Sequence, residues 1–268
     1  MGIRIGGPAG GGVEVIATPF IRDRLWIQDS DTAEKITEVN PDTKGIIKEY
    51  VGPGSSDRYG YGIGGTSTRM YRHSTSLTSE YIREFPPNSP FTTLNAVAQI
   101  DSTVRYVGGI FSRLYTMGQN TTTDIWEVNP DTIATINTFS NPVDSGGGRG
   151  LGGIKDSNRL YFGTSSTYLI REINPDTGGL LNSAGAPYNN GGIGGVSNRL
   201  YFTDSSNGRI YGVNPDTLAS LGYVSQGLAR DGVGGISPTN YDISVNALID
   251  DVIEPDVRYL IYNGRNFY

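Results

Sequence analysis

Short runs of alternating apolar and polar residues fill this chain, and each run ends at a cluster of Gly, Pro, Asn, Asp or Ser. Residues 198–204 and 209–213, for example, are rich in aromatic residues and are separated by a Ser/Asn/Gly cluster. Such runs predict short β-strands joined by tight turns. No stretch keeps the apolar period of an amphipathic helix. The pattern therefore predicts an all-β protein.

The strand pattern repeats along almost the whole chain. The tetrapeptide Asn-Pro-Asp-Thr occurs at 40–43, 129–132, 174–177 and 214–217. A double glycine recurs in phase with it, with the second glycine at 65, 109, 153, 195 and 235. An Arg followed by an apolar and an aromatic residue recurs at 24, 69, 113, 159 and 199. A period of about 40–46 residues is typical of propellers, solenoids and arrays.

Each period holds four predicted strands, which indicates a β-propeller blade. The first blade is expected to start near Val13, and four more follow from the double glycines at 65, 109, 153 and 195. A degenerate copy at 254–257 lies as far past Gly235 as Asn214 lies past Gly195. The sequence thus predicts one propeller of six four-stranded blades over residues 13–268, the sixth blade being degenerate. Blade two also departs from the repeat, with residues 85–88 reading Phe-Pro-Pro-Asn where the tetrapeptide is expected.

Residues 1–12 are interpreted as a glycine-rich lead-in to this domain. The segment 3–5 (Ile-Arg-Ile) offers an extra short strand that can pair with the last blade and close the ring. Closure would leave no long unpaired sheet edge.

The repeated motifs have a structural interpretation. Proline sets the backbone of a tight turn, and Asn and Asp side chains bond to the backbone nearby. Glycine suits an innermost strand, where backbones approach closely. We expect the repeated Arg to pair with the repeated Asp of the turn, an ion pair copied from blade to blade.

The run Arg-Leu-Tyr-Phe-Thr-Asp at 199–204, followed by Ile-Tyr-Gly-Val-Asn-Pro-Asp-Thr at 210–217, resembles the YVTN and NHL-type propeller repeats. Those repeats likewise have a Tyr-bearing second strand and a third strand that ends in an Asp/Pro/Thr turn. The resemblance covers about residues 13–260, but this chain is richer in glycine and lacks a consistent Tyr-Val-Thr-Asn core. The resemblance implies the fold and leaves the function open, because propellers include hydrolases, lyases, lectins and scaffolds.

Composition narrows the class of partner. The 268 residues fit a single propeller, and a net charge of −6 argues against nucleic acid as a partner. The chain has no cysteine, and hence no disulfide or thiolate chemistry. No apolar stretch is long enough for a classical signal peptide or a membrane span. We therefore expect a soluble protein, cytoplasmic or virion-associated, with no membrane partner; the compartment stays open.

The sequence offers little for catalysis. His73 is the only histidine, which excludes zinc sites with several His ligands, and we interpret it as a surface residue rather than a base. The predicted inner strands around the double glycines carry no acid, which argues against a glycosidase with carboxylates in the channel. Residues 29–31 (Asp-Ser-Asp) are too few for a calcium loop. No catalytic residue, metal or cofactor is predicted, and the chain is not expected to be an enzyme.

One pattern points to a ligand. An arginine lies a few residues before four of the double glycines, and tyrosines stand close by in sequence; together they form the predicted arginine/tyrosine collar at one mouth of the channel: Arg58, Arg105, Arg149, Arg230, Tyr59, Tyr61 and Tyr188. Guanidinium groups suit carboxylate, sulfate or phosphate, and tyrosines can stack on a sugar ring. Alternatively, these arginines pair with the nearby Asp57, Asp144 and Asp231.

Three functions follow from these observations. The favoured one is a non-catalytic protein-interaction or structural module that presents loops on a rigid ring. Its Gly/Asn/Ser/Thr/Tyr-rich composition resembles bacteriophage virion proteins, which makes a part in a larger assembly plausible. The alternative is a lectin-like binder of glycans or anions at the collar. A propeller hydrolase or lyase is disfavoured by the single histidine and the acid-free inner strands. The oligomeric state stays open.

Overall fold

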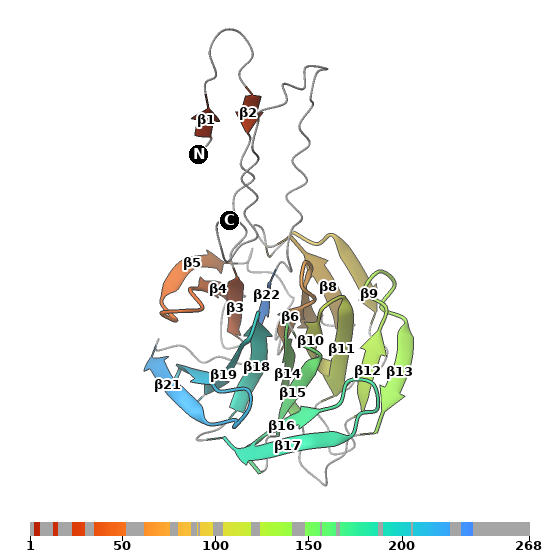
Figure 1. Ribbon diagram of the computed structural model, residues 1–268. Coiled ribbons are helices and arrows are strands. Elements are labelled where there is room, and N and C mark those ends of the chain that lie inside the picture. The colour runs from red at the N-terminus through yellow and green to blue at the C-terminus, as the bar shows by residue number, and fades with distance from the viewer. Residues whose placement is uncertain are drawn as a thin grey trace, which may run out of the picture. The chain divides into compact units, whose positions relative to one another are not determined.

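The computed structural model forms a closed β-propeller between Asp23 and Ser237 (Figure 1). The structure describes residues 3–5, 13–15, 23–29, 35–51, 62–75, 80–86, 90, 92–98, 104–118, 124–140, 148–155, 157–164, 167–186, 190–204, 206–225 and 232–237. The terminal segments 1–22 and 238–268 form a second compact unit. In that unit, β1 (Ile3–Ile5) pairs antiparallel with β2 (Val13–Val15).

The propeller consists of five antiparallel sheets of four strands, numbered here as blades 1 to 5 and given from the innermost strand outward. Blade 1 contains β22 (Gly232–Ile236), β3 (Arg24–Asp29), β4 (Lys35–Val39) and β5 (Ile46–Val51). Blade 2 contains β6 (Ile63–Gly65), β7 (Met70–Thr75), β8 (Glu80–Phe85) and β9 (Asn95–Ala98). Blade 3 contains β10 (Val104–Ile110), β11 (Arg113–Gly118), β12 (Ile125–Val128) and β13 (Thr135–Phe139).

The last two blades have the same order. Blade 4 contains β14 (Gly148–Ile154), β15 (Arg159–Thr164), β16 (Leu169–Ile173) and β17 (Leu180–Gly185). Blade 5 contains β18 (Asn190–Val196), β19 (Arg199–Asp204), β20 (Arg209–Val213) and β21 (Ser220–Ser225). The prediction of an all-β propeller with four-stranded blades is confirmed.

The prediction of six blades is wrong, because the fifth double glycine does not open a further blade. Its strand β22 is the innermost strand of blade 1, where Gly235 pairs with Leu25 of β3. The ring is thus closed by the C-terminal end of the repeat, whereas β1 pairs with β2. The degenerate copy at 254–257 lies outside the described residues. Each double glycine marks one inner strand, and five inner strands make five blades.

The inner strands approach so closely that their double glycines cannot carry a side chain. A Cβ atom on Gly108 would overlap the carbonyl oxygen of Leu151 in the next blade, and one on Gly152 would lie 2.5 Å from that of Ile193. The first glycines of all five pairs make such contacts around the ring, ending with Gly234 against Ile63. Glycine is required there by close backbone approach, as predicted.

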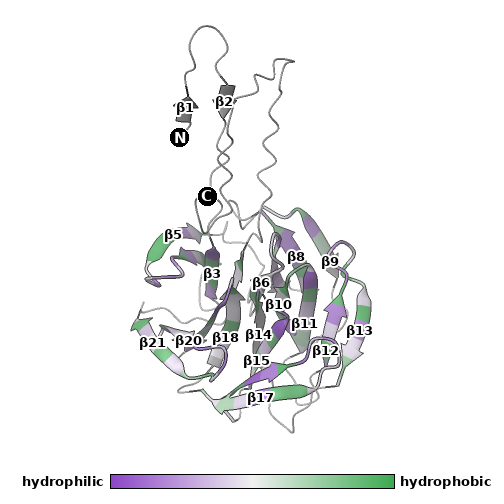
Figure 2. Ribbon diagram, viewed as in Figure 1, coloured by the Kyte–Doolittle hydropathy of each residue, from purple (hydrophilic) through white to green (hydrophobic). Residues whose placement is uncertain are grey.

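The apolar core is divided into five clusters, one at each interface between neighbouring blades. At the closing interface, Val196 and Tyr201 of blade 5 pack with Leu25 and Val233 of blade 1. Figure 2 shows apolar residues along the inner strands and also on the outermost strands. The inner ones are buried in these clusters, which hold the blades face to face.

A polar network on the Asn-Pro-Asp-Thr side joins the same blades. Arg113 donates to Glu127 of its own blade (Nε–Oε1 2.7 Å) and to Asp176 of blade 4 (Nη1–Oδ1 2.5 Å). The Tyr115 hydroxyl donates to the carbonyl of Pro175 in the same turn (3.4 Å). Blades 2 and 4 repeat this pattern toward blades 3 and 5. The predicted Arg–Asp pair is confirmed, and the structure shows that it crosses to the next blade from blades 2, 3, 4 and 5.

Each Asn-Pro-Asp-Thr segment forms the same turn. In blade 4 the Asn174 side-chain oxygen accepts the backbone N–H groups of Asp176 (2.8 Å) and Thr177 (3.2 Å). The residue after the threonine has positive φ in all four copies: Lys44, Ile133, Gly178 and Leu218. The turn was predicted from Pro, Asn and Asp, whereas the left-handed residue was not, since only one copy has glycine there.

Two junctions depart from the network. Between blades 5 and 1, Gly212 stands where the other blades have the glutamate, and Arg199 pairs with Asp42 and lies 3.7 Å from Asp23. Between blades 1 and 2, Trp26 replaces the tyrosine, and its buried Nε1 has no hydrogen-bond partner among the described residues. The second departure matches the degenerate turn of blade two.

We predict that Arg113→Met lowers the free energy of unfolding by about 2–3 kcal/mol, because it leaves the nearly buried Glu127 carboxylate without its bidentate partner. Asp176→Asn serves as the control and should cost under about 1 kcal/mol, since Asp176 is 60% exposed. Urea denaturation measures both. Equal losses in the two variants would contradict the dominance of the pair within the blade.

We also predict that the fragment 23–237 folds cooperatively and that 23–231 does not. The shorter fragment lacks β22, which exposes the edge of β3 and removes Val233 and Ile236 from two core clusters. Circular dichroism and urea denaturation check this. A cooperative transition in 23–231 would mean that the ring does not need this closing strand.

Candidate functional site

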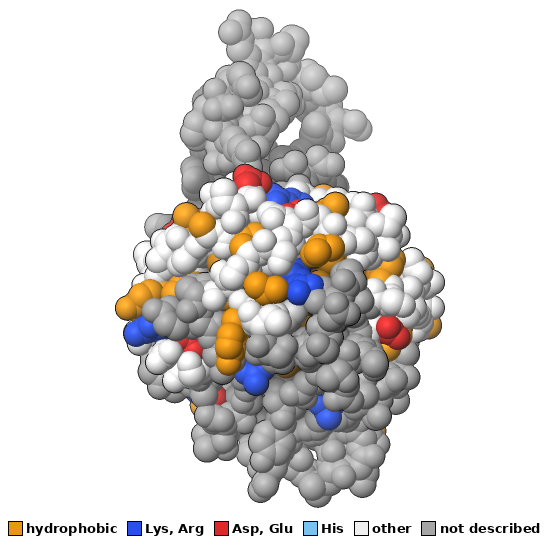
Figure 3. Space-filling model, turned by 90° about the horizontal axis from the view of Figure 1, so that it is seen from below, with side chains coloured by type: hydrophobic (Ala, Val, Ile, Leu, Met, Phe, Trp, Pro, Cys, Tyr) orange, Lys and Arg blue, Asp and Glu red, His pale blue; other side chains and the backbone are white. Residues whose placement is uncertain are grey.

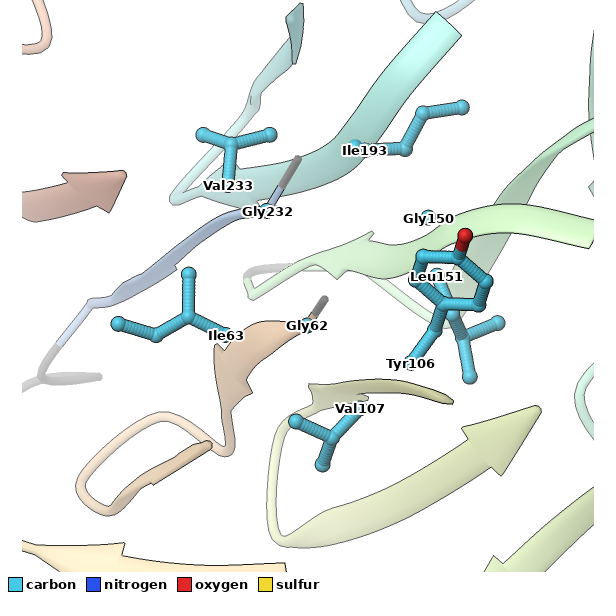
Figure 4. Close-up of a pocket in the computed structure, with 10 residues that line it drawn as sticks. Gly62, Ile63, Tyr106, Val107, Gly150, Leu151, Ile193, Gly232 and Val233 are labelled. Atoms are coloured by element: carbon cyan, nitrogen blue, oxygen red, sulfur yellow. The ribbon is translucent and has the colours of Figure 1, made fainter. Parts of the chain in front are cut away.

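The channel is nearly filled by backbone where the inner strands begin. A narrow hollow is lined there by two consecutive residues from each blade (Figure 4). The first of the two is Gly62, Gly150, Gly192 or Gly232 in four blades, and Tyr106 in blade 3. Tyr106 is buried and packs into the core between blades 3 and 4. The residues that line the hollow carry no charged side chain.

The structure describes two residues of the predicted arginine/tyrosine collar. Arg105 and Arg149 lie on β10 and β14, each four residues before the second glycine, and both are half-buried. They hold equivalent places in adjacent blades, one residue before the lining of the hollow. The other predicted residues, Arg58, Arg230, Tyr59, Tyr61 and Tyr188, lie outside the described residues. The collar as a whole stays a prediction.

His73 is fully buried on β7, so its interpretation as a surface residue is wrong. Burial and, secondarily, the positive charge of Arg105 lower its pKa to about 3. The imidazole is therefore neutral at physiological pH. The repeat places His73 at the same position in blade 2 as Gln28 in blade 1, since His73 lies opposite Ile82 and Gln28 opposite Ile36. Gln28 is also buried.

A buried lysine lies where the inner strands end. Lys155 follows β14, and its Nζ donates to the backbone carbonyl oxygens of Gly65 in blade 2 and Gly109 in blade 3 (the latter 2.5 Å). The side chain is 1% exposed, and burial lowers its pKa to about 7. Sequence reasoning missed it. The available signal was that Lys155 stands where the other blades have Ser67, Phe111, Ser197 and Ser237.

Each blade exposes a large apolar residue at an equivalent position, which lies on the outermost strand in blades 1, 3, 4 and 5 and one residue before β9 in blade 2. These residues form what we call the apolar rim: Ile47, Leu94, Ile136, Leu181 and Leu221, each 57–65% exposed. In blades 1 to 4, the rim residue comes directly before the residue that lies opposite the glutamate of the Arg–Glu pair. In blade 4, for example, Leu181 precedes Asn182, which pairs with Glu172. Sequence reasoning missed the rim, although in four blades the residue lies at a fixed distance after the tetrapeptide.

Four of the five outermost strands carry no charged residue, whereas β5 (IIKEYV) contains Lys48 and Glu49. Strands β9, β13, β17 and β21 read NAVA, TINTF, LLNSAG and SLGYVS and contain no charged residue. Figure 3 looks at the ring from below and shows hydrophobic side chains at its surface among mostly uncharged ones. Proteins commonly protect sheet edges with charged residues, so these edges are unusually open to pairing.

The described residues contain no cluster of three His, Cys, Asp or Glu that could hold a metal ion. Asp204 is buried and caps its own hairpin, accepting the backbone N–H groups of Ser206 (3.0 Å) and Asn207 (3.3 Å). Residues 30–31 of the other Asp-rich turn lie outside the described residues. Within the described ranges, the structure also has no helix that could cross a membrane.

Comparisons with known proteins show the fold. No family model matches the chain, and no curated protein matches it. A chain of a nidogen/laminin complex is 12% identical, with a TM-score of 0.53, over 81% of this chain and 99% of that one. Myxococcus xanthus glutaminyl cyclase is 12% identical, with a TM-score of 0.51, over 68% of this chain and 73% of its own.

The chain is a β-propeller. At this identity the matches support no more than the fold, and they do not identify the YVTN or NHL repeat type. A Bacteroides caccae protein of unknown function is also similar, at 15% identity and a TM-score of 0.47, over 76% of this chain and 73% of that one. A propeller is compatible with an interaction module, and its partner has to be argued from this chain's own surface.

We predict that acid destabilises the protein partly through His73. Its pKa is about 3 in the folded state and about 6.5 in the unfolded state, so the unfolded chain binds more protons between these values. Stability is therefore complete above about pH 6.5 and is lost as pH falls toward 3. His73→Gln, which copies blade 1, should flatten the dependence by up to about 1.4 kcal/mol per pH unit. Parallel curves for the two proteins, measured by urea denaturation from pH 3 to 7, would contradict this role.

Proposed function

We propose that this chain is a non-catalytic interaction module that binds a protein partner along the outer strands of its propeller. The observation that carries the proposal is the apolar rim: one exposed Ile or Leu at the same register in all five blades. Exposed apolar side chains that recur on a rigid scaffold favour a binding surface over chance, since single exposed residues are ordinarily scattered.

The chemistry of the outer strands suggests how the partner binds. In each blade the outermost strand has a neighbour on one side only among the described strands, so its other edge has backbone groups available for pairing. The partner we propose contributes an extended segment with apolar residues at alternate positions, adding a strand to this edge. Main-chain hydrogen bonds would supply affinity, and the rim residue would supply register.

The residues at the centre of the propeller favour a binding site on its outer strands over one on its axis. The hollow on the axis is lined by glycine, aliphatic residues and Tyr106, and Lys155 is used internally. An assembly role, such as a virion component, is supported by the uncharged outermost strands of blades 2 to 5 and the Gly/Asn/Ser/Thr/Tyr-rich composition.

A second candidate is binding of glycans or anionic ligands at the arginine/tyrosine collar. It is favoured by the equivalent places of Arg105 and Arg149 in adjacent blades beside the hollow. It ranks second because only these two of the seven predicted residues are described, whereas the rim repeats in all five blades.

The test uses displayed random peptides selected on the whole protein. We expect extended peptides with alternating apolar residues, whose Kd rises at least tenfold in the double variant Leu181→Lys/Leu221→Lys. The matched control, Ser183→Lys/Ser225→Lys, adds the same charges at exposed polar positions of the same two strands and should bind normally. All variants should keep the wild-type melting temperature, because the substituted side chains are exposed.

Two results would overturn the proposal. Peptide binding that is equal in the two double variants would place the site off the rim. Binding of sulfated glycans that is lost in Arg149→Ala and kept in the rim variant would move the function to the arginine/tyrosine collar.

A further inference from the structure

The glycine carbonyls at the end of the inner strands form a repeated arrangement around the axis. The carbonyl oxygen of Gly65 lies 2.7 Å from where a Cβ of Gly109 would be, and that of Gly109 lies 3.2 Å from the same point on Gly153. Blades 4, 5 and 1 continue the series, through the carbonyls of Gly153 and Gly195. The carbonyl oxygens of Gly65, Gly109, Gly153 and Gly195 thus each lie against the second glycine of the next blade; we call these four carbonyls the carbonyl ring.

Lys155 places its ammonium on this ring. The Nζ atom, carried by blade 4, reaches the carbonyl oxygens of both Gly65 and Gly109, which belong to two other blades. One side chain therefore links three of the five blades: its own blade 4 and, through hydrogen bonds, blades 2 and 3. A fivefold repeat can fit only one such side chain on its axis, which explains why the four equivalent positions are Ser or Phe.

The charge of Lys155 is held without a carboxylate. Among the described residues, no carboxylate forms an ion pair with its ammonium, which instead donates to two backbone carbonyls. A buried cation without a counter-ion is costly unless dipoles replace its hydration shell. Rings of backbone carbonyls perform this function for monovalent ions, whereas calcium sites ordinarily include carboxylates.

We propose that the carbonyl ring is a binding site for a small monovalent cation, and that Lys155 occupies it as a tethered ammonium. The class of ligand follows from the ligating atoms. Neutral carbonyl oxygens, without carboxylates, suit a cation of single charge, either an alkylammonium or an alkali ion. In its protonated form the lysine occupies the site, so the wild-type protein then needs no free ion at its axis.

The test is chemical rescue of Lys155→Ala in the full chain. This variant vacates the ring and leaves two carbonyls without their donor, so its melting temperature should fall. Methylammonium chloride should restore it, with a rise of about 3–6 °C at a tenfold excess over Kd. Tetramethylammonium chloride, which has no N–H donor and is larger, controls for ionic strength and should have no such effect. Potassium chloride tests whether an alkali ion also fits.

Lys155→Met is the matched variant, because it keeps most of the volume of the side chain, is only one atom shorter and supplies no charge. With methionine filling most of the space, this variant should lose stability and show no rescue, and wild type should not respond to methylammonium either. If Lys155→Ala does not fold alone, refolding yield with methylammonium is compared with the yield with tetramethylammonium. Rescue of the alanine variant alone supports the site, with or without a response to potassium. Equal behaviour of Lys155→Ala in all three salts overturns it.

Discussion

The close approach of five backbones at the axis is the constraint on which the rest of this propeller depends. Strands that meet with no room for a Cβ atom can be built only from glycine, and the paired glycines of each inner strand meet that need. The close approach also determines what the axis can contain: a narrow hollow at one level and a ring of carbonyl oxygens at the other. Little space remains for a substrate between these described residues.

Farther from the axis, the blades are held by interactions that repeat from one interface to the next. Each apolar cluster draws on two neighbouring blades, and the Arg–Glu–Asp network crosses the same boundaries on the Asn-Pro-Asp-Thr side. The exposed Asp residues add little by themselves, because solvent screens them. The buried part of each pair, such as Arg113 with Glu127, is where removal of one partner is costly.

The departures from the repeat are informative because the other blades show what is missing. At the closing junction, Gly212 stands where the other blades have a glutamate, and Arg199 interacts with Asp23 and Asp42 instead. Trp26 leaves a buried N–H without a partner among the described residues, at the junction with the blade whose sequence lacks the tetrapeptide. The apolar rim, by contrast, is kept in all five blades although each of its residues is more than half exposed, which is why we propose that it binds a partner.

The sequence by itself determined the features that depend on local pattern: four strands in each period, the Asn-Pro-Asp-Thr turns, the glycines of the inner strands and the Arg–Asp pairing. Repetition made these visible, because each recurs at a fixed spacing. Tertiary structure alone decided the number of blades, since Gly235 and Leu25 lie far apart in sequence and ring closure joins them. It also decided the burial of His73 and Lys155, because whether a polar residue faces solvent or the neighbouring blade depends on how the blades stack. The place of the rim on unpaired edges follows from the same stacking, which covers the inner strands and leaves the outer ones open.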